Sequence, residues 1–283
     1  MNELTKLIKP RDNNANKGTF GRALLICGSY TMAGAAIIAA DACIKSGIGI
    51  CDVACEDRVY PIVSTAVPEA VFTPLSFEFN SRDKQNLKAS IKRAKCVVIG
   101  CGMGNTEYTD KILQTVLEFC EVPLIIDADG LNVLSKNIEL LNQKKCEIII
   151  TPHPGEMGRL IKKTPAEINE HRIETATEFS KKHQVVTLLK GHNTVISDTF
   201  GEYFINKSGN SGMATGGSGD CLSGILAALI CDGLSPYDAA CVGAYIHGLA
   251  GDKSAKKYSK HSTSARTMLN ELPNVFLEIE NEQ

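Results

Sequence analysis

The sequence of 283 residues lacks several features that define particular classes of protein. Its first residues contain no apolar signal region, and no apolar run approaches membrane-spanning length, which predicts a cytoplasmic protein without a membrane partner. The formal net charge is only −2, so bulk charge predicts no nucleic-acid partner. No linker, low-complexity tract or short-period repeat divides the chain, and we therefore expect a single domain over residues 1–283.

The usual cysteine motifs are also missing, although the chain contains 11 cysteines. There is no Cys-x-x-Cys pair, and Cys51 and Cys55 have no nearby histidine to complete a zinc site. Several cysteines lie in apolar segments, where a reduced thiol behaves as a small hydrophobic side chain. Cys221 lies at an expected helix start, where a thiol can be nucleophilic, but we favour a packing role for it.

The segment from Gly209 to Asp220 is the most informative part of the chain, because five of its residues are glycine and it leads into an apolar helical stretch. Such a loop presents unpaired N–H groups and the positive end of the helix dipole, which together bind anions. Gly216, Gly217 and Gly219 let the backbone come close to a ligand's phosphates. No Gly-Lys-Ser/Thr follows these glycines, which excludes a Walker loop.

Asp220 has two interpretations. It is either a simple helix N-cap, which would stabilise the helix by about 1 kcal/mol, or a working base. Capping a helix does not require so many preceding glycines, so we favour a phosphate-handling loop with a positioned carboxylate.

Apolar strand-like segments alternate with helical ones. A strand at 22–27, an alanine-rich helix at 35–44 and a strand at 50–54 form a β-α-β unit, which predicts a parallel sheet. The helix has almost no polar face, which suggests a homo-oligomer. Further strands are expected at 95–100, 123–130, 147–151 and 185–190, then a hairpin at 194–205 and helices near 219–231, 236–257 and 264–279. The expected fold class is α/β with a mostly parallel central sheet.

Polar and glycine residues follow these strands, and the ligand crevice of an open parallel sheet lies at the carboxyl ends of its strands. We therefore expect one rim to hold the strand-end groups Gly28-Ser29, 100–104, Asp127 and Asp129, His153, Lys190 and the glycine loop. The segment Gly100-Cys101-Gly102-Met103-Gly104 lacks the final glycine of a dinucleotide fingerprint, so it only weakly favours a Rossmann dehydrogenase.

The other rim residues each keep two interpretations. Asp127 and Asp129 either cap a helix that begins near Leu131 or orient a hydrated magnesium ion or a ligand hydroxyl. His153, between two prolines, suits a structural and a ligand-binding role equally. The segment 190–194 suits phosphate or nucleotide binding, although a solvated turn is almost as compatible. We assign no function to His171, His183, His247 and His261.

Taken together, five motifs occur in a familiar order: Gly28-Ser29 with 32–36, then 126–132, 151–156, 190–196 and 209–220. They resemble the ADP-dependent NAD(P)H-hydrate dehydratase family of the ribokinase-like fold, over about residues 17–275. The resemblance implies a three-layer α/β/α fold and a homotetramer. Many members carry an N-terminal epimerase domain, for which we expect no room in this chain. Where many relatives have Gly-Pro-Gly-Leu-Gly, this chain has Gly-Cys-Gly-Met-Gly at 100–104.

The resemblance also implies a lyase reaction. Such enzymes convert the S form of hydrated NADH or NADPH (NADHX or NADPHX) to NAD(P)H with ADP and Mg²⁺, through a phosphorylated intermediate, and release AMP and phosphate. Asp220 would be the catalytic base. By motif, the hydrated nucleotide would contact Ala35, Gly102, His153 and Asp220; ADP would contact Lys190, Gly191, His192, Asn193, Thr194 and Gly219; and the phosphoryl group would be stabilised by Gly216, Gly217, Ser218 and Gly219.

Several alternatives stay open. A kinase of the same fold would phosphorylate a vitamin-precursor alcohol and stop at the ester, whereas a non-catalytic nucleotide-binding regulator would need no carboxylate at position 220. The sequence assigns no metal ligand and does not decide between NADH and NADPH or between ADP and ATP.

Overall fold

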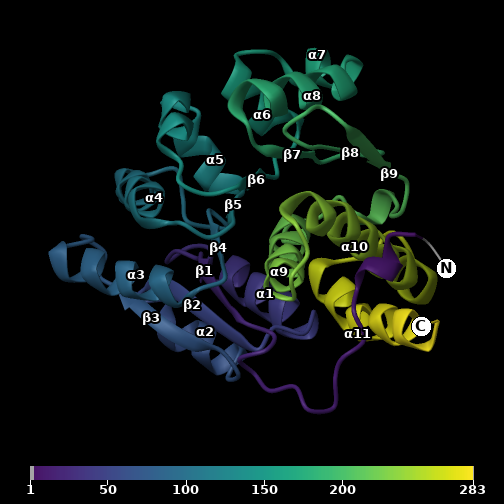
Figure 1. Ribbon diagram of the computed structural model, residues 1–283, viewed down its shortest axis with the longest axis horizontal. Helices are drawn as coiled ribbons and strands as arrows, with labels where there is room; N and C mark the ends of the chain where they lie inside the picture. Colours follow the sequence, from purple (N-terminus) through teal and green to yellow (C-terminus); the bar gives the residue numbers. More distant parts are fainter. Residues whose placement is uncertain (1–2, 283) are drawn as a thin grey trace.

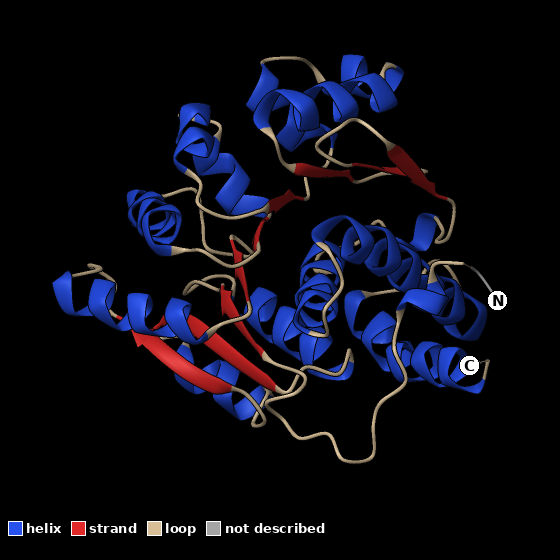
Figure 2. Cartoon of the chain, in the orientation of Figure 1, coloured by secondary structure: helices blue, strands red, loops and turns tan. Residues whose placement is uncertain are grey.

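A computed structural model describes residues 3–282 of the chain. One nine-stranded sheet runs through it in the order β3-β2-β1-β4-β5-β6-β7-β8-β9 (Figure 2). Neighbouring strands from β3 to β7 are parallel, whereas β8 and β9 are antiparallel. The strands are β1 Arg22–Ile26, β2 Ile50–Glu56, β3 Val71–Leu75, β4 Cys96–Ile99, β5 Leu124–Ile126, β6 Ile148–Ile150, β7 Val186–Leu189, β8 Thr194–Ser197 and β9 Tyr203–Asn206.

Helices cover both faces of this sheet (Figure 1). One face packs against α1 Ala33–Lys45, α2 Tyr60–Ala66, α9 Ser218–Cys231, α10 Pro236–Tyr258 and α11 Ala265–Asn281. The other face packs against α3 Ser81–Arg93, α4 Glu107–Phe119, α5 Ala128–Leu134, α6 Pro154–Ile161, α7 Pro165–Glu170 and α8 Arg172–His183. The predicted three-layer α/β/α fold with a mostly parallel sheet is confirmed. Within the described residues, no helix is both long and apolar enough to cross a membrane.

The central strands β4, β5 and β6 are continuous apolar runs because both of their faces are buried. In β1, Ala23 and Leu25 belong to the core beneath α1 and α9, whereas Leu24 and Ile26 belong to the core beneath α3 and α4. The predicted β8–β9 hairpin and the three closing helices are also present. The sheet therefore separates two apolar cores, one on each of its faces.

Helix α1 is buried more completely than its composition suggested. It packs against α9, α11 and α2 of the same chain, and its alanines at 36, 39, 40 and 42 are fully buried. Much of the apolar surface of α1 is therefore covered within one chain, whereas Ile37 and Ile38 are only partly buried, and the expected oligomer stays a prediction.

The order of the sheet reverses between β1 and β4. From β1 the chain proceeds outward to β2 and β3, then returns to the other side of β1 and builds β4 to β9. The carboxyl ends of the two strands at such a switch point form the crevice in which α/β proteins bind ligands. Gly28 follows β1 and Gly100 follows β4, so the glycine turns lie at this point.

The contact between α1 and α9 yields a first prediction. A Cβ atom on Gly224 would lie 2.8 Å from the Cβ of Ala42 and would collide with the carbonyl oxygen of Ala39. We expect Gly224→Ala to lower the free energy of unfolding by about 1–3 kcal/mol, because two close-packed helices must separate. Thermal unfolding followed by circular dichroism measures this loss.

Gly34→Ala is the matched control, because Gly34 lies in α1 and a Cβ there would meet no atom within 4 Å. Its stability should stay the same or rise slightly, since alanine favours helix more than glycine. Equal melting temperatures for the two variants would contradict close packing at Gly224.

Candidate functional site

The segments that follow five parallel strands meet at one edge of the sheet. The backbone N–H of Gly28 donates to the carbonyl of Cys101 at 2.8 Å, which joins the ends of β1 and β4. The N–H of Asp129 donates to Gly100 at 3.2 Å, and the N–H of Lys190 donates to Pro152 at 2.8 Å. The expected common rim of strand-end groups is therefore confirmed.

The glycine loop delivers the N-terminus of α9 to this rim. Gly217 is the N-cap residue and has a φ of 87°, a left-handed conformation that favours glycine. Among the described residues, no side chain caps this helix end, and a Cβ on Gly216 would meet no atom within 4 Å. The first turn of α9 thus offers N–H groups without a side-chain cap and the positive dipole end of an anion site, although the N–H of Ser218 already donates to the carbonyl of Thr215 at 3.3 Å.

Lys190, directly after β7, adds a full positive charge beside this helix end. Its Nζ lies 2.7 Å from Oδ1 of Asp127 and 3.8 Å from Oε2 of Glu156. A Cβ on Gly219 would lie 3.3 Å from the same Nζ, so the ammonium group lies against the first turn of α9. Burial alone would lower the pKa of Lys190, but the two carboxylates raise it, so the side chain stays charged.

Asp127 is the N-cap of α5 and is almost completely buried. Its Oδ1 accepts from the N–H of Ala128 at 2.8 Å, and its Oδ2 accepts from Oγ of Ser223 at 2.8 Å. Burial acts to raise the pKa of Asp127, but Lys190 and Ser223 lower it overall. The capping interpretation is correct for Asp127, and the helix that it caps begins at Ala128, three residues before Leu131.

Asp220 does not cap α9, because the N-cap is Gly217. Burial raises the pKa of Asp220 to about 6, and the negative charge of Asp127 adds to this effect, while Cys101 and Lys190 partly offset it. The simple capping interpretation is therefore wrong. A carboxyl group with this pKa is poised to accept a proton near neutral pH.

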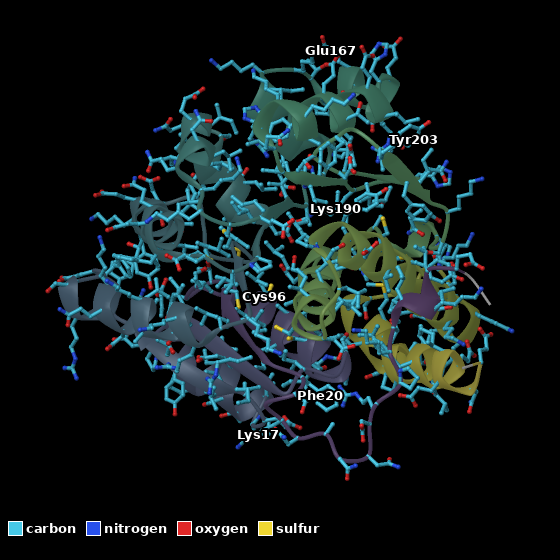
Figure 3. The ribbon with its side chains drawn as sticks, in the orientation of Figure 1. Lys17, Phe20, Cys96, Glu167, Lys190 and Tyr203 are labelled. Atoms are coloured by element: carbon cyan, nitrogen blue, oxygen red, sulfur yellow. The ribbon has the colours of Figure 1, made fainter. Side chains whose placement is uncertain are left out.

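A cavity of about 820 Å³ opens beside the N-terminus of α9. Lys190 lies between the sheet and helices α9 and α10 (Figure 3). The predicted residues that line this cavity are His153, Lys190, Gly191, His192, Asn193, Thr194, Gly216, Ser218 and Gly219. All six residues predicted to contact ADP therefore border one space, which is large enough for a nucleotide.

The residues predicted to contact the hydrated nucleotide are divided. Ala35 and Gly102 lie together, since a Cβ on Gly102 would be 2.5 Å from the Cβ of Ala35. His153 instead lies on the wall of the larger cavity with Lys190, where its Nδ1 accepts from the N–H of Gly155 at 2.9 Å and caps α6. Asp220, in the first turn of α9, lies close enough to Cys101 for a hydrogen bond.

Sequence reasoning missed part of the cavity wall. His247 of α10 lies on this wall with its Nε2 3.3 Å from Oγ of Ser218, and burial lowers its pKa to about 4. Asn206 at the end of β9 also lines the cavity and donates to the carbonyl of Ala244 at 3.0 Å. A histidine in an apolar helix gives no local signal, so only the packing of α10 reveals its position.

The carboxylates of this rim already have hydrogen-bond partners, which bears on metal binding. Asp129 accepts from the N–H of Gly104 at 2.7 Å and from Asn132 at 3.1 Å, and both oxygens of Asp127 already have partners. Within residues 3–282 there is no group of three or more His, Cys, Asp or Glu side chains that could hold a metal ion. A magnesium ion here would need oxygen atoms of its ligands as well, which is how Mg²⁺ usually binds beside phosphates.

Cys221 has the packing role that we favoured. Its side chain is fully buried, and burial raises the pKa of the thiol to about 12. A thiol with such a pKa is not a nucleophile near neutral pH.

The fold and the site define a nucleotide-binding α/β protein of the ribokinase-like class. A family model for NAD(P)H-hydrate dehydratase matches residues 23–274, and the chain belongs to this family. The ADP-dependent (S)-NAD(P)H-hydrate dehydratase of Bacillus subtilis is 31% identical over 271 residues, which cover 95% of this chain and 94% of that enzyme.

Two further comparisons agree. A bifunctional NAD(P)H-hydrate repair enzyme of Moorella thermoacetica is 37% identical over 276 residues, 96% of this chain but 52% of that enzyme. The chain thus spans about half the length of the bifunctional relatives it matches. The crystal structure of an ADP/ATP-dependent NAD(P)H-hydrate dehydratase from Bacillus subtilis, co-crystallised with ATP/Mg²⁺, superposes with a TM-score of 0.85 at 28% identity, over 98% of this chain and 96% of the other.

The raised pKa of Asp220 yields a prediction about stability. A folded-state pKa of about 6 against 3.8 means that ionising this group weakens the fold, with no effect below about pH 4 and the full effect above about pH 6. We expect Asp220→Asn to raise the free energy of unfolding at pH 7 by up to about 3 kcal/mol. The gain should vanish at pH 4, which urea denaturation at the two pH values measures.

Glu202→Gln serves as a control, because Glu202 is exposed in the β8–β9 turn. It should change stability by less than about 0.5 kcal/mol at either pH. An equal gain from Asp220→Asn at pH 4 and pH 7 would contradict the electrostatic explanation.

Proposed function

We propose that this chain is an ADP-dependent (S)-NAD(P)H-hydrate dehydratase, a carbon–oxygen lyase that repairs hydrated nicotinamide nucleotides. The observation that carries this proposal is the position of Asp220 beside the N-terminus of α9 and Lys190, with a pKa of about 6. The named activity of the Bacillus subtilis relative, with which the chain aligns almost from end to end, supports it. The proposal covers one dehydratase domain over residues 1–283.

The larger cavity holds ADP in this proposal. The base and ribose lie along the wall formed by 190–194 and α10, and the phosphates reach Lys190 and the N–H groups of 216–219. Charge that develops on the phosphoryl oxygens is stabilised by fixed N–H dipoles and one ammonium group, which need no reorganisation during the reaction. Mg²⁺ would supply further charge neutralisation when it is held mainly by the phosphate oxygens.

The hydrated ring lies on the opposite side of Asp220, toward Ala35 and Gly102. The carboxylate of Asp220 accepts the proton of the ring hydroxyl while the hydroxyl oxygen attacks the terminal phosphorus of ADP, and the bond to AMP breaks. The ring nitrogen then expels phosphate from the adjacent carbon. The departing phosphate takes a proton from the next carbon, which restores the dihydropyridine ring, so the products are NAD(P)H, AMP and phosphate.

A product assay distinguishes the proposed function from two others. A kinase of the same fold would accumulate a phosphate ester and would not regenerate the reduced ring. A non-catalytic regulator would consume no ADP, and the raised pKa of Asp220 would then have no purpose.

The proposed base yields a third prediction. Asp220→Asn should lower kcat by about 10²- to 10⁴-fold, because no carboxylate accepts the proton. ADP affinity should change little, since the anion site consists of backbone N–H groups and Lys190. Absorbance of the reduced ring, followed with hydrated NADH, Mg²⁺ and either ADP or ATP, measures turnover, and calorimetry measures ADP binding.

The pH profile provides an internal control for this variant. The kcat of the unaltered enzyme should rise with pH around a midpoint near 6, because the base must be deprotonated. Near-normal turnover by Asp220→Asn would end the assignment of the base, and ester accumulation by the unaltered protein would favour the kinase.

Assembly and compartment are part of the same proposal. We predict a homotetramer, as the family resemblance implies, and a cytoplasmic enzyme, which the 11 free cysteines support because thiols stay reduced there. Light scattering at micromolar concentration should give four times the mass of 30.5 kDa. A monomer mass would refute the tetramer.

A further inference from the structure

A second cavity, of about 550 Å³, opens beyond the carboxyl ends of β1 to β4. Its wall includes Ser29 after β1, Arg58 after β2, Phe77 after β3 and Met103 after β4. It shares no lining residue with the larger cavity, and the reaction described above uses none of its side chains.

This second cavity adjoins the predicted position of the hydrated ring. Met32 and Met103 line it, and the Cβ of Met32 lies 3.1 Å from where a Cβ on Gly102 would be. Gly102 in turn follows Cys101, which lies within hydrogen-bond reach of Asp220. A ligand whose reacting ring rests on Gly102 can therefore extend into the second cavity.

The wall of the second cavity presents planar groups to solvent. Tyr30 is 65% exposed and Phe77 is 59% exposed, which is unusual for side chains of this size. The guanidinium of Arg58 lies 5.0 Å from the ring centre of Tyr30 and 4.6 Å from that of Phe77. Phe77 also stacks on Tyr108 with ring centres 6.3 Å apart. Aromatic rings with an interleaved arginine form a stacking surface for a nucleobase.

Two hydroxyl groups of the same wall have unused hydrogen-bonding capacity. Oγ of Ser29 and the phenolic oxygen of Tyr108 are shielded from solvent and have no hydrogen-bond partner among residues 3–282. Ser29 is only 8% exposed. A buried hydroxyl without a partner is destabilising. A ligand with ribose hydroxyls or ring nitrogens would supply the missing hydrogen bonds.

We propose that the second cavity binds the adenosine half of the dinucleotide substrate. This inference rests on the proposed function, in which ADP occupies the larger cavity and the adenosine of hydrated NADH needs a separate place. The second cavity lies next to the predicted ring position at Gly102. It offers the stacking surface and the unpaired hydroxyls that an adenosine requires.

The test compares two substrates, hydrated NADH and hydrated reduced nicotinamide mononucleotide, which lacks the adenosine half. For the double variant Tyr30→Ala/Phe77→Ala, we expect KM for hydrated NADH to rise about tenfold more than KM for the mononucleotide, as loss of base stacking requires. Both side chains are largely exposed, so the variant should fold. An equal change for the two substrates, or no change, would overturn the proposal.

The matched control is Phe200→Ala/Tyr203→Ala. Phe200 and Tyr203 are 81% and 50% exposed near the β8–β9 turn and line neither cavity, so this pair should alter neither KM. A similar KM effect from the control pair would also count against the site.

A binding measurement separates this inference from the proposed function. With the larger cavity saturated by ADP, NADH fluorescence should report binding that is about tenfold weaker in Tyr30→Ala/Phe77→Ala than in the unaltered protein. If neither substrate is turned over, the proposed reaction is wrong, but that result does not test the adenosine site. The NADH titration still tests that site. Equal NADH affinity in the two proteins, or no NADH binding, would overturn it.

Discussion

Lys190 and Asp127 come from the ends of two strands, β7 and β5, and their ion pair, at 2.7 Å, links both strands to α9. A buried pair is stable only when its remaining bonding capacity is satisfied, and Asp127 meets this condition through Ala128 and Ser223. Because Ser223 belongs to α9, the carboxylate of Asp127 also fixes the distance between this helix and the sheet. Removing one partner of such a pair typically costs about 3–5 kcal/mol.

The same arrangement sets the chemistry of Asp220. Asp127 lies near enough to oppose the ionisation of Asp220, whereas Lys190 partly compensates and also attracts an anionic ligand. The site thus combines an ammonium group, which attracts anions, with a carboxyl that is costly to ionise. In the proposed function, the stability lost at this position would provide a base with a pKa of about 6, a trade-off that is common in enzyme sites.

Local patterns in the sequence predicted much of this structure. Contacts between residues far apart in the chain could not be predicted from such patterns. The apolar runs predicted the strands other than β3, whose residues are mostly exposed or half-buried, and the glycines from 209 to 219 identified the entry of α9. Both patterns reflect backbone requirements of consecutive residues. The contact of Asp127 with Ser223 joins residues 96 positions apart, and no local pattern encodes it. His247 was overlooked for the same reason, since only the packing of α10 brings it to Ser218.

The order of the strands bears on how one carboxylate would serve the two ligands of the proposed reaction. The segments after β6 and β7, the end of β9 and helices α9 and α10 line the larger cavity, whereas the segments after β1 to β4 line the second cavity. Asp220, in the first turn of α9, is near enough to Cys101 and Lys190 for both to lower its pKa. Phosphoryl transfer needs donor and acceptor to approach from opposite directions. In the proposed reaction, the two cavities would provide two such approaches, with the carboxylate of Asp220 in the first turn of α9 as the proton acceptor.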